Sequence, residues 1–419
     1  MRAGWICLVV LSSSLGACGR TAPFGPPGDV PSDAGTTPDS GRLDSGLIDT
    51  GVPLPDAGCT TALAPIASNP IADEQPFVID AFPVAGGTVV LSRQDGLTSL
   101  VGLERGEAKA IGAGVEQIID ATATAVLGAQ NGRLVVLSEG STPLSGVLRP
   151  MFRGTRPRYF DNDRLVLCSR TRELSLFDTR TFETLASTRV LSCPSLVYAS
   201  PRGVLLGTDE SMLGGLYELW NPTSSAPVPT IGPASGPLGG VIFGDTAYTL
   251  EFGQVVAHPL ADPINAEVFH LGPCAWLEAN TTHMALGCGV SSSSMFPAIA
   301  TALEVYDGRT RTTIDTGGRV VLSPQLGDGF VAWLEYEDES ALCSATPGSG
   351  RLMVQDLVAG GAPTAHARLD APCLCCGAVW PEPELIVRGD TLVYNYPSGG
   401  LTIPGRGRHE ALVLRRQCR

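Results

Sequence analysis

Residues 327–339 read GDGFVAWLEYEDE, and after a variable loop residues 351–361 read RLMVQDLVAGG. In the first stretch an Asp-Gly pair, which favours a tight turn, leads into an apolar run that starts at Phe330. The second stretch is another short apolar run, and it ends near Asp356. Short runs of this kind, bounded by Gly, Asp, Asn and Pro, are typical of β-strands. No stretch after residue 60 shows a sustained helical period, so the chain is expected to be all-β.

The same pair of runs recurs along the chain. The first run of each pair lies at 87–92, 124–129, 164–169, 203–208, 246–251, 283–288, 330–335 and 391–396. Equivalent positions from Val90 to Val393 are 36, 40, 39, 42, 38, 46 and 62 residues apart. A period near 40 residues with several strands per unit is the signature of a β-propeller blade. We therefore expect one β-propeller of about eight blades, or seven if the end units merge. A pair of β-sandwiches is the alternative, but it would need no constant period.

Two of these units carry a resemblance to a known family. Residues 327–361 and the unit DNDRLVLCSRTRELSLFDTRTFETL at 161–185 resemble the repeats of the TolB and WD40-like β-propeller superfamily. In those repeats an Asp-Gly turn leads into a buried strand, and the next strand ends V-x-D-L-x-x-G. The Gly-His and Trp-Asp pairs of true WD40 repeats are absent from the sequence. The resemblance implies the fold and leaves the function open, because one fold hosts many functions.

The N-terminus has the pattern of an export signal. Arg2 precedes an apolar core at residues 3–11, which is shorter than the roughly 20 apolar residues of a membrane-spanning helix. A charged start, a brief apolar core and a small-residue exit are typical of a secretory leader. Leu15-Gly16-Ala17-Cys18 resembles the lipobox of bacterial lipoproteins, which implies cleavage before Cys18 and lipid on its sulfur. Gly19 is the family pattern for the outer membrane, on its periplasmic face or at the cell surface. An ordinary leader with an incidental Cys18 is the alternative.

Residues 18–58 then change in composition. They are rich in Pro, Gly, Asp, Ser and Thr, and such a segment buries too little apolar surface to offset the entropy of ordering. Five Asp-Xaa-Gly triplets begin at 33, 39, 44, 49 and 56, whereas calcium-binding β-rolls need a strict nine-residue period. We therefore expect a signal peptide at 1–17, a lipidated Cys18 with a disordered tether to 58, and the propeller at 59–419.

The cysteines support an oxidising compartment. The chain has 12, and ten remain once Cys7 leaves with the leader and Cys18 carries lipid. An even set in an exported chain favours disulfides. Position in the chain predicts Cys59–Cys418 to close the ring, Cys168–Cys193, Cys274–Cys288, and Cys343 with one of Cys373, Cys375 and Cys376, whose other two members then pair.

Other interpretations of the 373–376 segment are weaker. A zinc site with His366 lacks the two separated pairs of a zinc ribbon. A Cys-Xaa-Xaa-Cys redox pair needs a helix start, which Pro372 and Gly377 do not favour. A vicinal disulfide resembles that of quinoprotein dehydrogenases, but their repeated Trp-docking motif is not found.

The formal net charge of −14 argues against nucleic acid as a partner and against wide contact with an anionic membrane. Basic residues gather in two groups: Arg149, Arg153, Arg156, Arg158, Arg164, Arg170 and Arg172, and Arg406, Arg408, His409, Arg415, Arg416 and Arg419. Guanidinium forks bind carboxylate or phosphate, which makes Arg149, Arg153, Arg156 and Arg158 candidate anion ligands. Ion pairs with Asp161, Asp163 and Glu173 are the alternative.

Signals of catalysis are weak. The sequence has no Gly-Xaa-Ser-Xaa-Gly motif, and its five His residues lie in no triad context. The acidic stretch from Glu335 to Glu339 is expected to be a solvated loop, although it could hold a cation. We expect no catalytic, cofactor or metal residues. The sequence therefore favours a monomeric, non-enzymatic, lipid-anchored propeller that binds a protein or glycan partner at the cell envelope. The alternative is an envelope enzyme, hydrolase or quinoprotein-like, that uses the central channel.

Overall fold

The structure is a computed structural model of the chain. It describes residues 59–65, 77–84, 87–94, 97–104, 107–113, 117–121, 126–130, 133–137, 141–143, 159–161, 164–168, 173–178, 181, 183–190, 195–208, 215–224, 228–234, 239–289, 299–344, 350–369, 384–397 and 407–418. Side chains are described at 127–128, 135, 164–166, 173–178, 181, 183–190, 198–207, 215–224, 228–233, 239–289, 299–342, 350–366 and 385–394. The predicted leader and tether lie outside these residues.

The described strands form eight four-stranded antiparallel sheets. The first half of the chain supplies β1 (Cys59–Pro65), β2 (Phe77–Val84), β3 (Gly87–Gln94), β4 (Leu97–Glu104), β5 (Glu107–Ala113), β6 (Gln117–Ala121), β7 (Val126–Gln130), β8 (Arg133–Leu137), β9 (Ser141–Pro143), β10 (Tyr159–Asp161), β11 (Arg164–Cys168), β12 (Glu173–Asp178), β13 (Thr184–Arg189), β14 (Ser195–Ser200), β15 (Gly203–Thr208), β16 (Gly215–Trp220) and β17 (Thr230–Ala234). The second half supplies β18 (Gly240–Phe243), β19 (Thr246–Glu251), β20 (Gln254–Pro259), β21 (Glu267–His270), β22 (Cys274–Ala279), β23 (Met284–Cys288), β24 (Ala302–Tyr306), β25 (Arg311–Ile314), β26 (Val320–Gly327), β27 (Phe330–Tyr336), the short helix α1 (Ala341–Ser344), β28 (Gly350–Asp356), β29 (Thr364–Leu369), β30 (Glu384–Arg388), β31 (Thr391–Pro397) and β32 (Gly407–Cys418).

Each apolar run of the repeat becomes the second strand of a sheet. All seven residues of β27 are buried, and so are all five of β23. A continuous apolar run fits a strand that is covered on both faces, here by the neighbouring sheets. The outermost strands are polar and exposed, as the burial patterns of β13 and β25 show. In the sheets whose side chains the structure describes, burial falls toward the outermost strand, which explains why the second strands dominate the sequence repeat.

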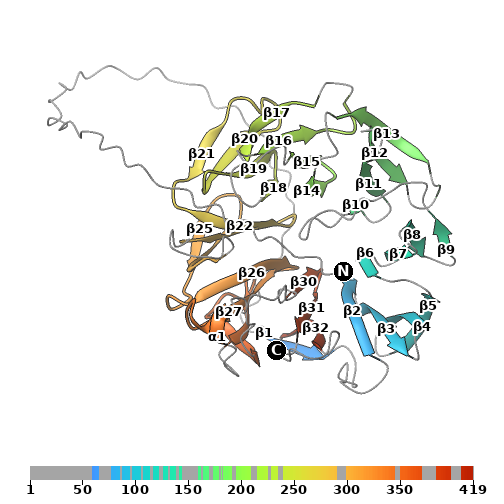
Figure 1. Ribbon diagram of the computed structural model, residues 1–419. Helices are drawn as coiled ribbons and strands as arrows, with labels where there is room; N and C mark the ends of the chain where they lie inside the picture. The colour runs from blue at the N-terminus through green and yellow to red at the C-terminus, as the bar shows by residue number, and fades with distance from the viewer. Residues whose placement is uncertain are drawn as a thin grey trace, which may run out of the picture. The chain divides into compact units, whose positions relative to one another are not determined.

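The sheets pack in chain order around their innermost strands. Contacts join β2 to β6, β10 to β14, β14 to β18, β18 to β22, β22 to β26, β26 to β30, and β30 back to β2. Figure 1 shows the sheets from β14 to β30 following one another in this way. The buried apolar clusters lie between neighbouring sheets rather than inside one of them; one joins residues of β27 and β31, such as Phe330 and Tyr394. This is a β-propeller, which confirms the predicted fold class, whereas the number of blades stays a prediction.

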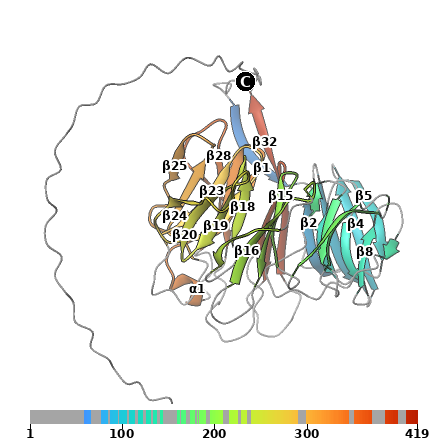
Figure 2. The same cartoon turned by 90° about the horizontal axis from the view of Figure 1, so that it is seen from above.

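The two ends of the body share one sheet. Its strand order is β1-β32-β31-β30, so the first strand of the body completes the sheet that the last three strands build. Blue β1 runs beside red β32 in Figure 2. The register pairs Cys59 with Cys418 and Pro65 with Leu412. The pairing of β1 with β32 therefore closes the sheet. Hydrogen bonds between these two strands satisfy backbone groups that would otherwise lie at an exposed strand edge.

Candidate functional site

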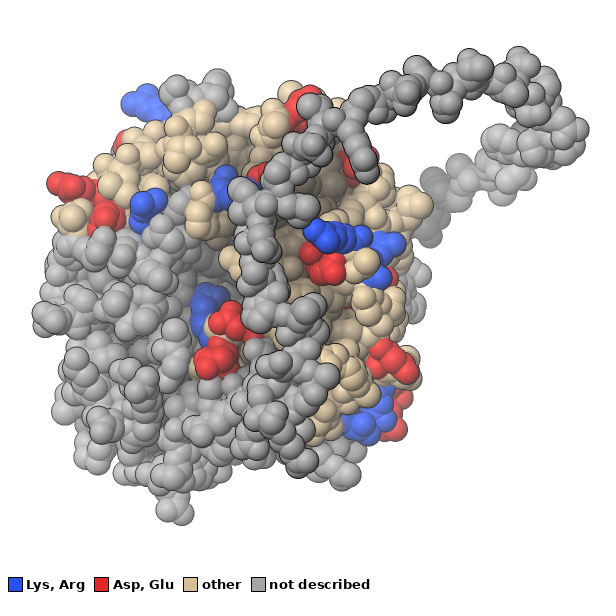
Figure 3. Space-filling model, turned by 180° about the vertical axis from the view of Figure 1, so that it is seen from behind, with Lys and Arg blue, Asp and Glu red and all other residues tan. Residues whose placement is uncertain are grey.

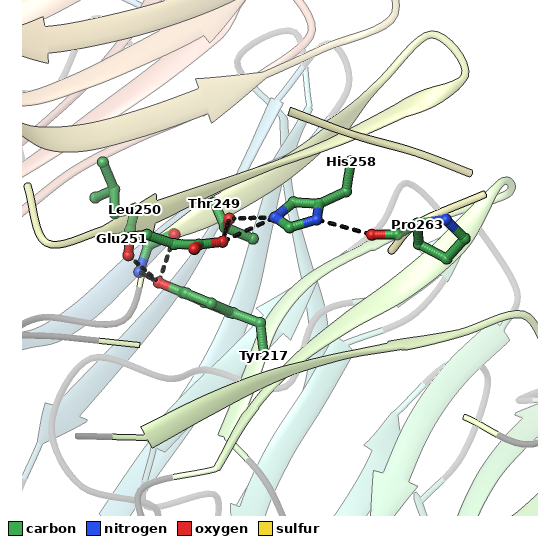
Figure 4. A network of polar contacts seen from close by, with 7 residues as sticks. Tyr217, Thr249, Leu250, Glu251, His258 and Pro263 are labelled. Atoms are coloured by element: carbon green, nitrogen blue, oxygen red, sulfur yellow. Dashed lines mark hydrogen bonds and ion pairs between the residues drawn. The ribbon is translucent and has the colours of Figure 1, made fainter. Parts of the chain in front are cut away.

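A buried polar network joins the sheet β14–β17 to the sheet β18–β21 (Figure 4). Tyr217 of β16 is fully buried, and its hydroxyl lies 2.8 Å from the carbonyl oxygen of Gly239 and 3.1 Å from that of Leu250. The same hydroxyl accepts a hydrogen bond from the Gly239 N–H at 3.1 Å. Burial is the main cause that raises the pKa of Tyr217 to about 12. The phenol therefore stays neutral and ties the two sheets together.

His258 lies in the same seam. Its Nε2 is 2.8 Å from Glu251 Oε1, and its Nδ1 is 3.0 Å from the carbonyl oxygen of Pro263. The Thr249 hydroxyl lies 2.7 Å from the same Glu251 oxygen and 3.1 Å from Nε2. A backbone carbonyl only accepts, so Nδ1 donates to Pro263. In a nucleophilic triad the hydroxyl and the carboxylate bind opposite ring nitrogens, whereas here both approach Nε2. Thr249, Glu251 and His258 therefore hold strands β19 and β20 together, and we call these three residues the clamp.

The clamp leaves no space around Glu251. A Cβ atom on Gly232 of β17 would lie 2.2 Å from Glu251 Oε1. The side chain of His258 is 1% exposed and that of Glu251 is 11% exposed. The inner part of this network is therefore largely buried.

Glu335 corrects the expectation of a solvated acidic loop. It lies within β27, is buried, and accepts a hydrogen bond from Trp333 Nε1 at 3.4 Å. Arg319 Nε lies 3.4 Å from its other oxygen. Burial raises the pKa of Glu335, against the opposing effects of Trp333 and Arg319. Asp338 instead accepts hydrogen bonds at the start of α1, from Ser340 Oγ at 2.6 Å and from the Ala341 N–H at 2.8 Å.

A disulfide lies at one end of the sheet β22–β25. Cys274 and Cys288 are bonded with an S–S distance of 1.99 Å, the pair that their spacing predicts. His270 Nδ1 lies 3.6 Å from Cys274 Sγ, and the three potential ligand atoms lie within 4.8 Å of one another. Metals bind cysteine as thiolate, so the oxidised pair offers no thiolate ligand.

Among the described side chains, several exposed apolar ones belong to one sheet. Seven large hydrophobic side chains are exposed among those the structure describes, and four belong to β18–β21 or its loops: Phe252, Ile264, Val268 and Leu271. Three of them lie along the outermost strand β21. Ile264 precedes this strand, Val268 is within it, and Leu271 comes directly after it. We call these four residues the apolar strip.

Two members of this strip, Phe252 and Leu271, lie on neighbouring turns. Phe252 is 74% exposed and has a φ of 51°, a conformation that is unusual for an aromatic residue. The Cys274 N–H donates to the carbonyl oxygen of Gly253 at 2.7 Å, which places the Leu271–Pro273 loop beside the turn that carries Phe252. The surface elsewhere carries charged side chains. On the face drawn in Figure 3, acidic and basic side chains lie beside one another in several places.

Most other sequence-predicted sites lie outside the described residues. These are Cys18, Cys193, Cys373, Cys375, Cys376, Arg149, Arg153, Arg156 and Arg158. Cys168 lies in β11 and Cys343 in α1, but their side chains are not described. Arg408, His409, Arg415 and Arg416 all lie in β32. The anion site and the remaining disulfides therefore stay predictions.

The chain is similar to several solved structures, each at low sequence identity. No family model and no curated protein sequence matches the chain. Similar solved structures include the C-terminal WD40 domain of Sif2, at 7% identity and a TM-score of 0.45 over 84% of this chain and 98% of that one. BamB from Moraxella catarrhalis is 12% identical, with a TM-score of 0.44 over 84% and 100% of the two chains. PorZ, an essential bacterial surface component of the type-IX secretion system of Porphyromonas gingivalis, is 13% identical, with a TM-score of 0.40 over 83% and 45%.

Among the described residues, no helix has the length and apolar character needed to cross a bilayer.

Proposed function

We propose that this chain is a lipid-anchored, non-catalytic β-propeller that binds a protein partner at the cell envelope through the apolar strip. The clustering of exposed apolar side chains on one sheet carries the proposal. Single exposed apolar residues are ordinary on a protein surface, whereas several together mark an interaction site. Aromatic and aliphatic side chains of this kind form the centres of protein interfaces.

The placement of the strip suits a binding surface. β21 is the last strand of its sheet, so one of its edges has no partner within that sheet. Val268 is 49% exposed on this strand, and Ile264 and Leu271, beyond its two ends, are 79% and 78% exposed. An extended segment of a partner could follow such an edge while its side chains cover the strip.

The buried titratable groups support a binding role over a catalytic one. The hydroxyl of Tyr217 is held by two backbone groups, and Nδ1 of His258 is held by Pro263. Glu335 is held by Trp333 and Arg319. The polar atoms of Tyr217, His258 and Glu335 therefore make hydrogen bonds and ion pairs that hold strands and sheets together. An envelope enzyme that uses the central channel stays the alternative.

The anchor is inferred from the lipobox alone. Two or more acyl chains hold a protein stably at a bilayer, since each buried methylene contributes about 0.8 kcal/mol. A tether of about 40 residues has a root-mean-square span of roughly 35 Å, which would leave the propeller free to reach its partner.

Capture from a native envelope tests the binding proposal. Val268→Asp is compared with Leu185→Asp, because Leu185 is 46% exposed on β13, the outermost strand of another sheet. We expect Val268→Asp, and Ile264→Asp likewise, to lose a protein that the wild type and Leu185→Asp both retain. Equal recovery with all variants, or capture that depends only on a glycan, would contradict the proposal.

A further inference from the structure

An imidazole and a carboxylate lie beside the Cys274–Cys288 disulfide. Cys274 begins β22 and Cys288 ends β23, directly opposite in the register. His270, the last residue of β21 in the neighbouring sheet, places Nδ1 3.6 Å from Cys274 Sγ. Its Nε2 lies 3.3 Å from Glu304 Oε1 of β24. Sulfur, imidazole and carboxylate therefore contact one another in that order.

The order matches that of an activated cysteine. There, a base contacts the sulfur and a third group orients the base. The Gly272 N–H donates to His270 Nδ1 at 2.9 Å, so the neutral ring carries its proton on Nε2 and donates it to Glu304. Arg311 Nε lies 3.2 Å from the second oxygen of Glu304 and forms an ion pair with that carboxylate.

We propose that the Cys274–Cys288 disulfide is a thiol–disulfide exchange site for a low-molecular-weight thiol, with Cys288 as the attacked sulfur and Cys274 as the leaving sulfur. The proposal does not depend on the apolar strip or its partner. Cys274 is assigned as the leaving group because its sulfur is the one beside His270. A neighbouring imidazolium stabilises a thiolate, and a more stable thiolate leaves faster.

The exchange balances with two equivalents of the small thiol. The first thiolate attacks Cys288 Sγ and forms a mixed disulfide there, while Cys274 Sγ leaves with the electron pair of the broken bond. Protonation of His270 at Nδ1 from solvent replaces the hydrogen bond from the Gly272 N–H, and the imidazolium then faces the new thiolate. The second thiolate attacks the sulfur of the small thiol in the mixed disulfide and releases Cys288. Two small thiols are thereby oxidised to one disulfide, and the cysteine pair is reduced.

Burial restricts which thiols can react. Cys274 and Cys288 are 5% and 2% exposed, so a folded protein would not reach them. Pro273 and Gly289, the next residue on each strand, are exposed, so the disulfide lies just beneath the surface at the end of the hairpin. We therefore expect a thiol as small as glutathione, rather than a folded protein, to react with this disulfide.

Reduction of the full-length chain by glutathione, in the presence of a metal chelator, tests the site. Free thiols are trapped at intervals by alkylation, and peptide mapping resolves Cys274 from Cys288. His270→Gln removes the imidazole, and Glu304→Gln removes the orienting charge. His283→Gln is the matched control, because His283 lies in the turn at the other end of the β22–β23 hairpin.

We expect His270→Gln to slow reduction by about tenfold or more, Glu304→Gln to slow it less, and His283→Gln to leave it unchanged. The trapped mixed disulfide should carry glutathione on Cys288. A rate for His270→Gln within about twofold of the wild type would overturn the proposal, as would glutathione on Cys274 or a wild-type disulfide that resists reduction.

A second readout separates chemistry from a structural effect of the substitution. In the reduced wild type, alkylation of Cys274 should persist to lower pH than alkylation of Cys288, and His270→Gln should remove that difference. The groups that face His270 are Cys274 of β22 and Glu304 of β24, with Arg311 of β25 behind the carboxylate. Identical pH profiles for the two wild-type cysteines would contradict the role of the imidazole.

Discussion

Cys59 lies directly opposite Cys418 in the antiparallel pairing of β1 with β32. Directly opposed residues of an antiparallel pair have Cα atoms about 4.5–5.5 Å apart, which falls within the range that a disulfide spans. The pairing joins the first strand of the body to the last. A disulfide at this position would covalently hold β1 against β32 and so keep the sheet closed.

We therefore expect a Cys59–Cys418 disulfide. The loop that it closes contains about 360 residues, and chain-entropy models assign such a bond on the order of 5 kcal/mol before native strain. Replacing both cysteines by Ser should lower the free energy of unfolding by about 2–5 kcal/mol in denaturant titrations. Peptide mapping without reductant should find the two peptides linked; a Cys59 that is free or joined elsewhere refutes this closure.

Stability should depend on pH through Glu335. Its pKa is raised in the folded protein by burial, so the folded state binds this proton more tightly than the unfolded state does. The associated stability is complete below the ordinary pKa of Glu and is lost as pH rises through the raised folded value. Glu335→Gln should therefore gain stability relative to the wild type as pH increases across this window.

Denaturant titrations at several pH values measure this difference, with the exposed Glu337→Gln as the control. A constant difference between the wild type and Glu335→Gln at all pH values would show that the carboxyl is not held in the way described.

Tyr217 should behave as a structural phenol. Tyr217→Phe leaves the Gly239 N–H without its hydroxyl partner inside the seam, so we expect a loss of about 1–3 kcal/mol in the free energy of unfolding. In the wild type, one tyrosine should ionise near pH 12 in an ultraviolet titration, and Tyr217→Phe should remove that step. Retention of the step in the variant would place the shifted phenol elsewhere.

Cys18→Ser tests the predicted anchor. Without the thiol no lipid can be attached, so the protein should leave the membrane fraction or accumulate with its leader uncleaved. Unchanged partitioning into detergent would mean that the Leu15–Cys18 match is incidental. Arg2→Ala, which keeps the match, serves as a check on export itself.

The fold could be predicted from the sequence because its repeat lies in the most buried strands. Val90, Val126, Val331 and Val393 mark second strands, and these strands have continuous apolar runs since sheets cover both of their faces. The outermost strand β21 has only four residues, two of them charged or polar, so Val268 carries no periodic signal. The strip was missed for this reason.

The polar groups show the same limit. Thr249, Glu251 and His258 lie on the two strands that flank the Phe252-Gly253 turn, and the turn could have suggested that their side chains share a face. It could not show that Pro263 and Gly232 enclose them, because those contacts come from a loop and from another sheet. Glu335 was expected in solvent, since its acidic neighbours gave no sign that β27 extends to Tyr336.

Site-specific photo-crosslinking in intact cells tests the proposed binding surface most directly. A photoreactive residue is placed at Val268 of β21 in one variant and at Leu185 of β13 in the other, two positions of matched exposure on outermost strands. We expect the probe at 268 to yield a defined crosslinked protein that the probe at 185 does not. Equal yields at both positions, or no protein product at 268, would contradict a partner-binding strip on this sheet.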